Sequence, residues 1–161
     1  MDDSLDFTRI IPTESMRGDS ARDTALLQQM LAEARDYVNS FEWCPPIVGT
    51  YFGGGVGGIM AVFLFRFGEK VTDIDQWLWV IVGDLPSAYF VIDGLPDPVT
   101  ATRTYCDLMQ DWVDAVRGGS SLDDVFPVAA EPTTEHAEML QTRLEFVRRE
   151  IIPVFEADAR E

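Results

Sequence analysis

Three glycines, Gly53, Gly55 and Gly58, are spaced as G-x-G-x-x-G in an otherwise apolar stretch. Glycines at this spacing can hold a phosphate, because they allow close backbone approach and the amides that open a following helix point toward the anion. Asp73 or Asp75 follows at about the distance at which an acid would hold a ribose hydroxyl. The spacing therefore raises the hypothesis of a dinucleotide site.

The same stretch resembles the amino-terminal fingerprint of flavin- and nicotinamide-binding enzymes over about thirty residues. That resemblance implies a strand over 47–52, a glycine loop and then a helix. The segment that would be this helix is rich in Val, Ile and Phe and apolar on every side, which favours a strand. Further strands are expected after it, whereas the dinucleotide fold requires alternating strands and helices. The dinucleotide hypothesis is therefore only an alternative.

Aromatic residues provide a second group that could form a site. Phe63 and Phe65 share one face of an expected strand, and Trp77 and Trp79 share one face of the next. If the register places the two pairs together, they form an aromatic wall, which would be either core or an apolar binding surface. The predicted ligand- or partner-binding residues are Phe63, Phe65, Trp77, Trp79, Gly53, Gly55 and Gly58.

The remaining reactive residues predict neither a catalytic nor a metal site, and no cofactor is expected. His136 is the single histidine, and no second histidine or matching cysteine pattern completes a zinc site. Cys44 and Cys106 form no CxxC motif and are expected to be free thiols. Ordinary turn chemistry explains the carboxylates expected near strand ends, which are Glu69, Asp73, Asp75, Asp84, Asp93 and Asp97.

The elements that must position these residues follow from local patterns. Apolar residues at helical spacing predict a helix from about Ser20 to the prolines at 45–46. Asp97-Pro98 and Thr133 are typical helix starts, and Pro153 is expected to kink or end the last helix. We expect an α+β fold, with a loose arm over 1–19 and one globular domain over 20–161. Its antiparallel meander of three strands (about 59–67, 76–83 and 87–93) is packed by an N-terminal helix and two C-terminal helices.

The uncharged window from Trp43 to Phe65 is also long enough for a membrane span. Six glycines, two prolines and the lack of flanking Lys or Arg clusters argue against one. No secretory signal precedes the window, so a cytoplasmic location is expected.

The net charge of −16 over 161 residues is the strongest compositional fact. It disfavours nucleic acid and anionic lipid as partners and favours a protein with a basic surface. We expect a small binding or interaction protein without catalytic activity, similar in size and acidity to bacterial inhibitor and immunity proteins. The alternative is a small-molecule binder or minor enzyme whose pocket lies between Gly53–Gly58 and the aromatic strands. A homo-oligomer is also compatible with the sequence.

Overall fold

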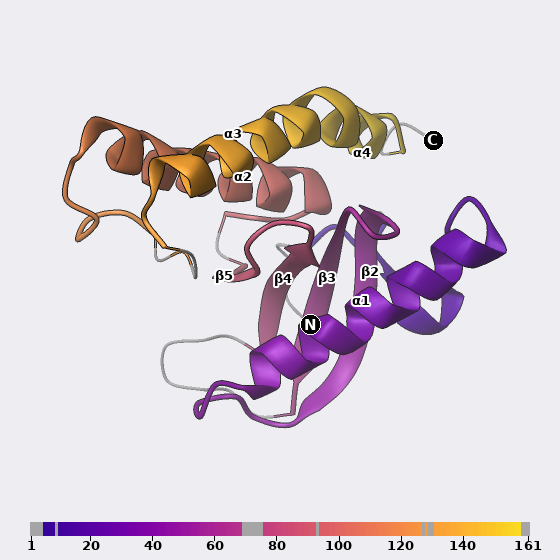
Figure 1. Cartoon of the computed structure of the whole chain (residues 1–161). Coiled ribbons are helices and arrows are strands. Elements are labelled where there is room, and N and C mark those ends of the chain that lie inside the picture. The colour runs from indigo at the N-terminus through magenta and orange to yellow at the C-terminus, as the bar shows by residue number, and fades with distance from the viewer. Residues whose placement is uncertain are drawn as a thin grey trace. The chain divides into compact units, whose positions relative to one another are not determined.

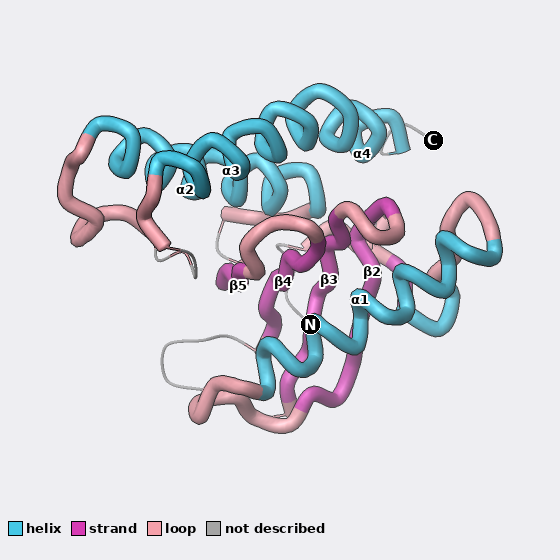
Figure 2. Tube along the Cα trace, viewed as in Figure 1, coloured by secondary structure: helices cyan, strands magenta, loops and turns pink. Residues whose placement is uncertain are grey.

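The computed structural model describes residues 5–8, 10–68, 76–92, 94–126, 128 and 131–158 (Figures 1 and 2). The chain divides into two compact units, Met1–Ala101 and Thr102–Glu161. The first unit contains a sheet and a helix, and the second is helical. Each unit is described by itself below.

Within the described residues, the first unit has a five-stranded antiparallel sheet in the order β1-β2-β3-β4-β5. The predicted α+β class is confirmed, and the three predicted strands correspond to the last three of the sheet. The prediction of a three-stranded meander is wrong in number, because two further strands precede it. The strands are β1 (Ile11–Pro12), β2 (Ile47–Val56), β3 (Met60–Phe67), β4 (Trp77–Gly83) and β5 (Ala88–Val91).

One face of the sheet is covered by helix α1 (Ala21–Asn39), which crosses β2, β3 and β4 (Figure 1). The helix begins where predicted, because the Ser20 hydroxyl accepts a hydrogen bond from the Asp23 amide at 3.1 Å. Its apolar stripe is buried against alternate residues of β3 and β4, as its spacing requires. The buried residues of the stripe are Leu27, Met30, Leu31, Ala34 and Val38.

The opposite face presents the intervening residues of β3 and β4, including Leu64 and Trp79, and both are buried. Within the first unit, two irregular segments are held beside it. The Trp79 indole Nε1 donates to the Leu95 carbonyl oxygen at 2.8 Å, and the Asp6 amide donates to the Pro96 carbonyl oxygen at 2.7 Å. Burial on both faces agrees with the continuous apolar runs of β3 and β4.

The segment expected to be a loose arm contributes to this unit. It supplies β1 and a short 3-10 turn, η1 (Thr13–Ser15). The Thr13 and Thr50 hydroxyl oxygens lie 2.6 Å apart and join the turn to β2. Ile10 and Met16 are buried, whereas Ile11 is exposed.

The second unit is an antiparallel arrangement of α2 (Pro98–Gly118, whose first turn belongs to the first unit) with α3 (Thr134–Phe146), η2 (Val147–Ile151) and α4 (Ile152–Asp158). Arg103 pairs with Glu156 at 3.1 Å, and Arg148 donates to the Gln110 side-chain oxygen at 2.8 Å. The helical path continues past Pro153, with the wider π-type turn of η2 just before it. Such a turn accommodates a proline that cannot donate a backbone hydrogen bond.

Among the described residues, none of the helices combines the length and the apolar composition needed to cross a bilayer. The uncharged window from Trp43 to Phe65 instead forms most of the β2–β3 hairpin.

Candidate functional site

The register between β3 and β4 separates the predicted aromatic wall into two faces. Phe63 lies opposite Val80 and Phe65 opposite Leu78, so both phenylalanines face α1, where they are fully buried. Trp77 and Trp79 lie on the other face. The condition for an aromatic wall is therefore not met, and Phe63 and Phe65 belong to the core.

The glycine run forms the end of a hairpin. Gly53 and Gly55 are part of β2, and Gly58 lies in the turn to β3 with a φ of 81°, a conformation that favours glycine. The turn leads directly into a strand, so the helix that a dinucleotide fingerprint requires is not formed. None of these glycines lines the pocket described below, so that pocket is not the one predicted between the run and the aromatic strands.

Four aromatic residues form a half-buried group where the end of α1 meets β5; we call Tyr37, Phe41, Trp43 and Tyr89 the rim cluster. The Phe41 and Trp43 rings stack with centroids 5.3 Å apart and an interplanar angle of 19°. Tyr89 contacts both rings, at 5.2 and 5.1 Å. The four rings therefore hold one another in place at the edge of the core under α1.

Burial changes the pKa of one residue of the rim cluster, and acidic residues lie near the cluster in sequence. Desolvation by burial, with a smaller contribution from Tyr89, raises the pKa of Tyr37 to about 12. Exposed acids lie beside the cluster in sequence: Glu33 one helical turn before Tyr37, Asp36 next to it, and Glu42 between Phe41 and Trp43. The rings of the cluster are therefore partly buried, and three exposed acids, which we call the acidic border, lie near them in sequence.

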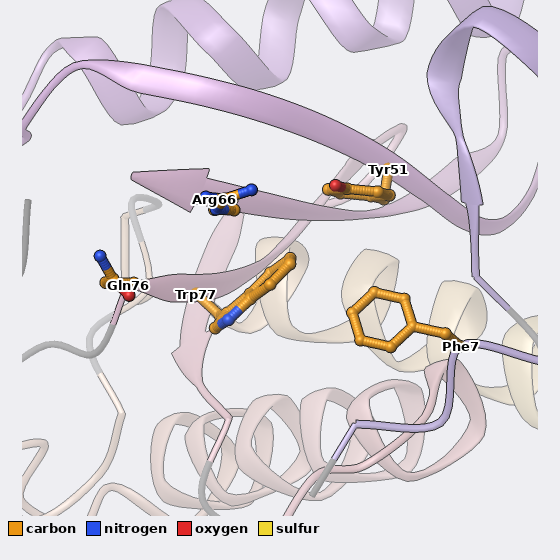
Figure 3. Close-up of a pocket in the computed structure, with 5 residues that line it drawn as sticks. All are labelled: Phe7, Tyr51, Arg66, Gln76 and Trp77. Atoms are coloured by element: carbon orange, nitrogen blue, oxygen red, sulfur yellow. The ribbon is translucent and has the colours of Figure 1, made fainter. Parts of the chain in front are cut away.

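A pocket of about 320 Å³ lies on the opposite face of the sheet, and we call it the Trp77 pocket. It is lined by Phe7 from the N-terminal segment, Tyr51 of β2, Arg66 of β3, Gln76 and Trp77 of β4. Figure 3 shows the Trp77 indole at the centre of the group, with Phe7 on one side and Arg66 and Gln76 on the other.

The aromatic walls of the Trp77 pocket contact one another. Ring centroids are 6.0 Å apart for Phe7 and Tyr51, 5.5 Å for Phe7 and Trp77, and 5.6 Å for Tyr51 and Trp77. The Arg66 guanidinium carbon lies 6.0 Å from the Trp77 ring centroid, near the outer limit of a cation–π contact. Within the described part of the chain, this guanidinium forms no ion pair with a carboxylate.

The two cysteines and the single histidine are the other side chains that could take part in chemistry. Burial raises the pKa of the Cys44 thiol, and it raises that of Cys106 to about 11 even though Arg148 opposes the shift. Neither thiol is thereby activated as a nucleophile. The His136 Nδ1 lies 3.1 Å from the Glu131 carbonyl oxygen, and the His136 amide donates to the Thr133 hydroxyl that caps α3.

Among the described residues, no three His, Cys, Asp or Glu side chains gather as a metal-binding group. Four of the carboxylates expected near strand ends lie outside the described residues, namely Glu69, Asp73, Asp75 and Asp93.

Sequence reasoning identified Trp77 but missed the other walls of its pocket. Phe7 comes from a segment far away in the chain, and its position depends on tertiary packing. Arg66 did carry a local signal, because it is the single charge in the strand Met60–Phe67. A lone cation at that position indicates that one side of an otherwise buried strand is open.

No family model, curated protein or solved structure matches this chain. Inferences about its function therefore depend on the geometry of the rim cluster and of the Trp77 pocket.

Proposed function

We propose that this chain is an acidic, cytoplasmic interaction module without catalytic activity, which binds a protein with a basic surface through the rim cluster. One observation carries the proposal: four aromatic rings contact one another while each stays partly exposed. Tryptophan and tyrosine dominate the binding energy of protein interfaces, since they bury a large area with few rotatable bonds.

Packing within the rim cluster favours binding for an entropic reason. Ordering a flexible side chain at an interface costs about 0.5–1.5 kcal/mol. The stacked rings of Phe41 and Trp43, wedged against Tyr89, are already ordered by their mutual contacts. A partner would therefore meet a largely preformed surface.

Charge around the rim cluster favours a basic partner. Glu33, Asp36 and Glu42 are close to the rings in sequence, and the whole chain carries a net charge of −16. An arginine or lysine of the partner could lie over the Trp43 ring while the acids attract it from a distance. Small inhibitor and immunity proteins share this combination of size and acidity, which supports the same class of function.

The first test compares capture of partners from an extract of the source cell by the wild-type chain and by Trp43→Ala. We expect a protein that is captured by wild type at low salt, lost with Trp43→Ala and retained with Val48→Ala. Val48 is a suitable control because it is an exposed apolar residue, 57% accessible, outside the rim cluster. If the Trp43 variant captures the same proteins as wild type, the rim cluster is not the interface.

A second test separates the acidic border from the overall charge. Asp36→Asn with Glu42→Gln removes two charges beside the cluster, and Glu135→Gln with Glu138→Gln removes two exposed charges on α3. We expect the first pair to slow association with the captured partner more than the second, and the difference to vanish near 1 M salt, where the screening length is about 3 Å. Equal effects of the two pairs would assign the attraction to net charge alone.

A further inference from the structure

The dimensions of the Trp77 pocket limit what it can hold. Its volume of about 320 Å³ is at the lower end of the roughly 300–1,000 Å³ typical of small-molecule sites. Three of its five lining side chains are aromatic, and their rings contact one another at 5.5 to 6.0 Å. Aromatic walls of this kind favour an apolar planar ligand, and the volume restricts it to a small molecule.

The positive charge of Arg66 sets a second requirement for the ligand of the Trp77 pocket. Arg66 contributes a guanidinium to the pocket, and its side chain is exposed rather than covered by protein. A guanidinium presents a planar set of N–H donors that matches a carboxylate with two parallel hydrogen bonds. Gln76 adds an amide that can donate or accept beside it. A cationic ligand would be repelled by Arg66, and a neutral ligand would leave this donor set unused.

The Tyr51 ring packs over a glycine that lies beside Arg66. Gly49 of β2 lies opposite Arg66 in the register between β2 and β3, and Trp77 lies opposite Arg66 on the other side. A Cβ added at Gly49 would lie 3.3 Å from the Tyr51 ring carbon Cε2 and 3.6 Å from the Arg66 Cβ. A larger side chain at position 49 would therefore displace the Tyr51 ring from the wall of the pocket.

From these three observations we infer that the Trp77 pocket binds a small aromatic carboxylate, with the ring against Phe7, Tyr51 and Trp77 and the carboxylate on the Arg66 guanidinium. This site is distinct from the rim cluster. The two share no residue, and they belong to opposite faces of the sheet, since Tyr89 lies opposite Val80 and Trp77 opposite Arg66.

The test uses the indole N–H resonances of the full chain, which has four tryptophans. The probe is benzoate, compared with benzamide, which lacks the charge, and cyclohexanecarboxylate, which lacks the planar ring. We expect benzoate to shift the Trp77 resonance, assigned with Trp77→Phe, and both analogues to bind more weakly. Trp79 is an internal reference, because its Nε1 is already bonded to Leu95, and Trp43 reports on the rim cluster.

Two variants test the residues that carry the inference. Arg66→Gln should weaken benzoate binding about tenfold, the usual effect of losing a charge-assisted hydrogen bond. Arg22→Gln, the same change at an exposed position of α1, should leave the affinity unchanged. Gly49→Val should reduce the affinity by displacing the Tyr51 ring from the pocket wall, while the resonances of Trp79 and Trp43 show that the fold is retained.

Several results would overturn the inference. A titration in which benzoate leaves the Trp77 resonance unmoved would do so, as would equal affinities for benzoate and benzamide. Unchanged benzoate binding in Arg66→Gln would remove the role of the guanidinium. A shift confined to Trp43 would assign the probe to the rim cluster, against the inference. Because the capture experiment depends on Trp43 and this one on Trp77, failure of either proposal can be recognised separately.

Discussion

The two faces of the β3–β4 hairpin are made by alternate residues of the same strands, yet they have different environments. On the α1 face, Phe65 lies opposite Leu78, and both are fully buried. One residue further along β3, Arg66 lies opposite Trp77 on the other face and is exposed in the Trp77 pocket. Phe65 therefore lies in the core under α1, whereas Trp77, which is 8% accessible, lines a pocket beside an exposed arginine.

The different environments of these aromatic side chains follow from the segments that cover each face, rather than from residue type. A helix with a continuous apolar stripe covers the phenylalanines completely. Among the described residues, Trp77 is contacted instead by the ring of Phe7, from an irregular segment, and by the ring of Tyr51 from β2. Where the covering element is small, space remains, and a cation can be placed beside the rings.

The largest effect is expected from Phe65→Ala, because it leaves a cavity under α1. Truncation of a fully buried phenylalanine lowers the free energy of unfolding by about 3–5 kcal/mol, and Phe65 is 0% accessible. Urea denaturation measures the change, with Val48→Ala as a control expected to stay within about 0.5 kcal/mol of wild type. Equal small losses in both variants would show that the α1 face is not the principal core.

An intermediate effect is expected from Trp79→Phe, on the face opposite α1. The replacement keeps an aromatic ring but removes the donor that reaches the Leu95 carbonyl at 2.8 Å. Loss of one partner from such a bond costs about 1–3 kcal/mol, measured by the same denaturation. If the variant is as stable as wild type, the hydrogen bond from Trp79 does not hold the segment around Leu95 against the sheet.

The edge of the α1 face can be examined by titration of Tyr37. Its folded pKa of about 12 lies above the ordinary value of 10.0, so between these pH values the folded chain keeps a proton that the unfolded chain has lost. The free energy of unfolding should therefore be unaffected below about pH 10 and should fall as the pH rises toward 12. The pKa of Tyr37 is measured from the phenolate absorbance of wild type after subtraction of that of Tyr37→Phe. A pKa near the ordinary value of 10.0 would mean that the rim cluster is fully solvated.

The smallest effect on stability is expected from Arg66→Gln. The Arg66 side chain is exposed, and it makes no ion pair within the described part of the chain. Its replacement should change the free energy of unfolding by no more than about 0.5 kcal/mol. A larger loss would mean that Arg66 supports the fold, and the contrast between the two faces would weaken.

The parts of the fold that could be predicted depend on local signals. The Ser20 and Thr133 hydroxyls cap their helices, and the β-branched and aromatic runs of β3 and β4 form strands within a residue of the expected bounds. Strand β2 is left out of the predicted meander, although the dinucleotide resemblance implies a strand over 47–52. Four of its ten residues are glycine, so its extended conformation depends on pairing with β3 rather than on its own preference.

The candidate sites could be predicted less well, because they depend on register and on distant segments. Period-two spacing shows that Phe63 and Phe65 share a face, but whether Trp77 joins them depends on the hairpin register, and a shift of one residue reverses the answer. Phe7 and Tyr89 approach their partners from other parts of the chain. The sequence around Phe7 or Tyr89 does not indicate which distant residues each ring contacts.

The hairpin turn between β2 and β3 is also attached to the start of α1. The Gly57 amide donates to the Asp23 carboxylate at 2.6 Å, and a Cβ at Gly57 would lie 2.8 Å from the Leu26 Cβ. The Gly57 amide proton should therefore exchange with solvent whenever α1 lifts from the sheet, even while the strands stay paired. Its exchange rate, compared with that of an amide in the centre of β3, would report whether the helix leaves before the sheet opens or whether both are lost in one cooperative event.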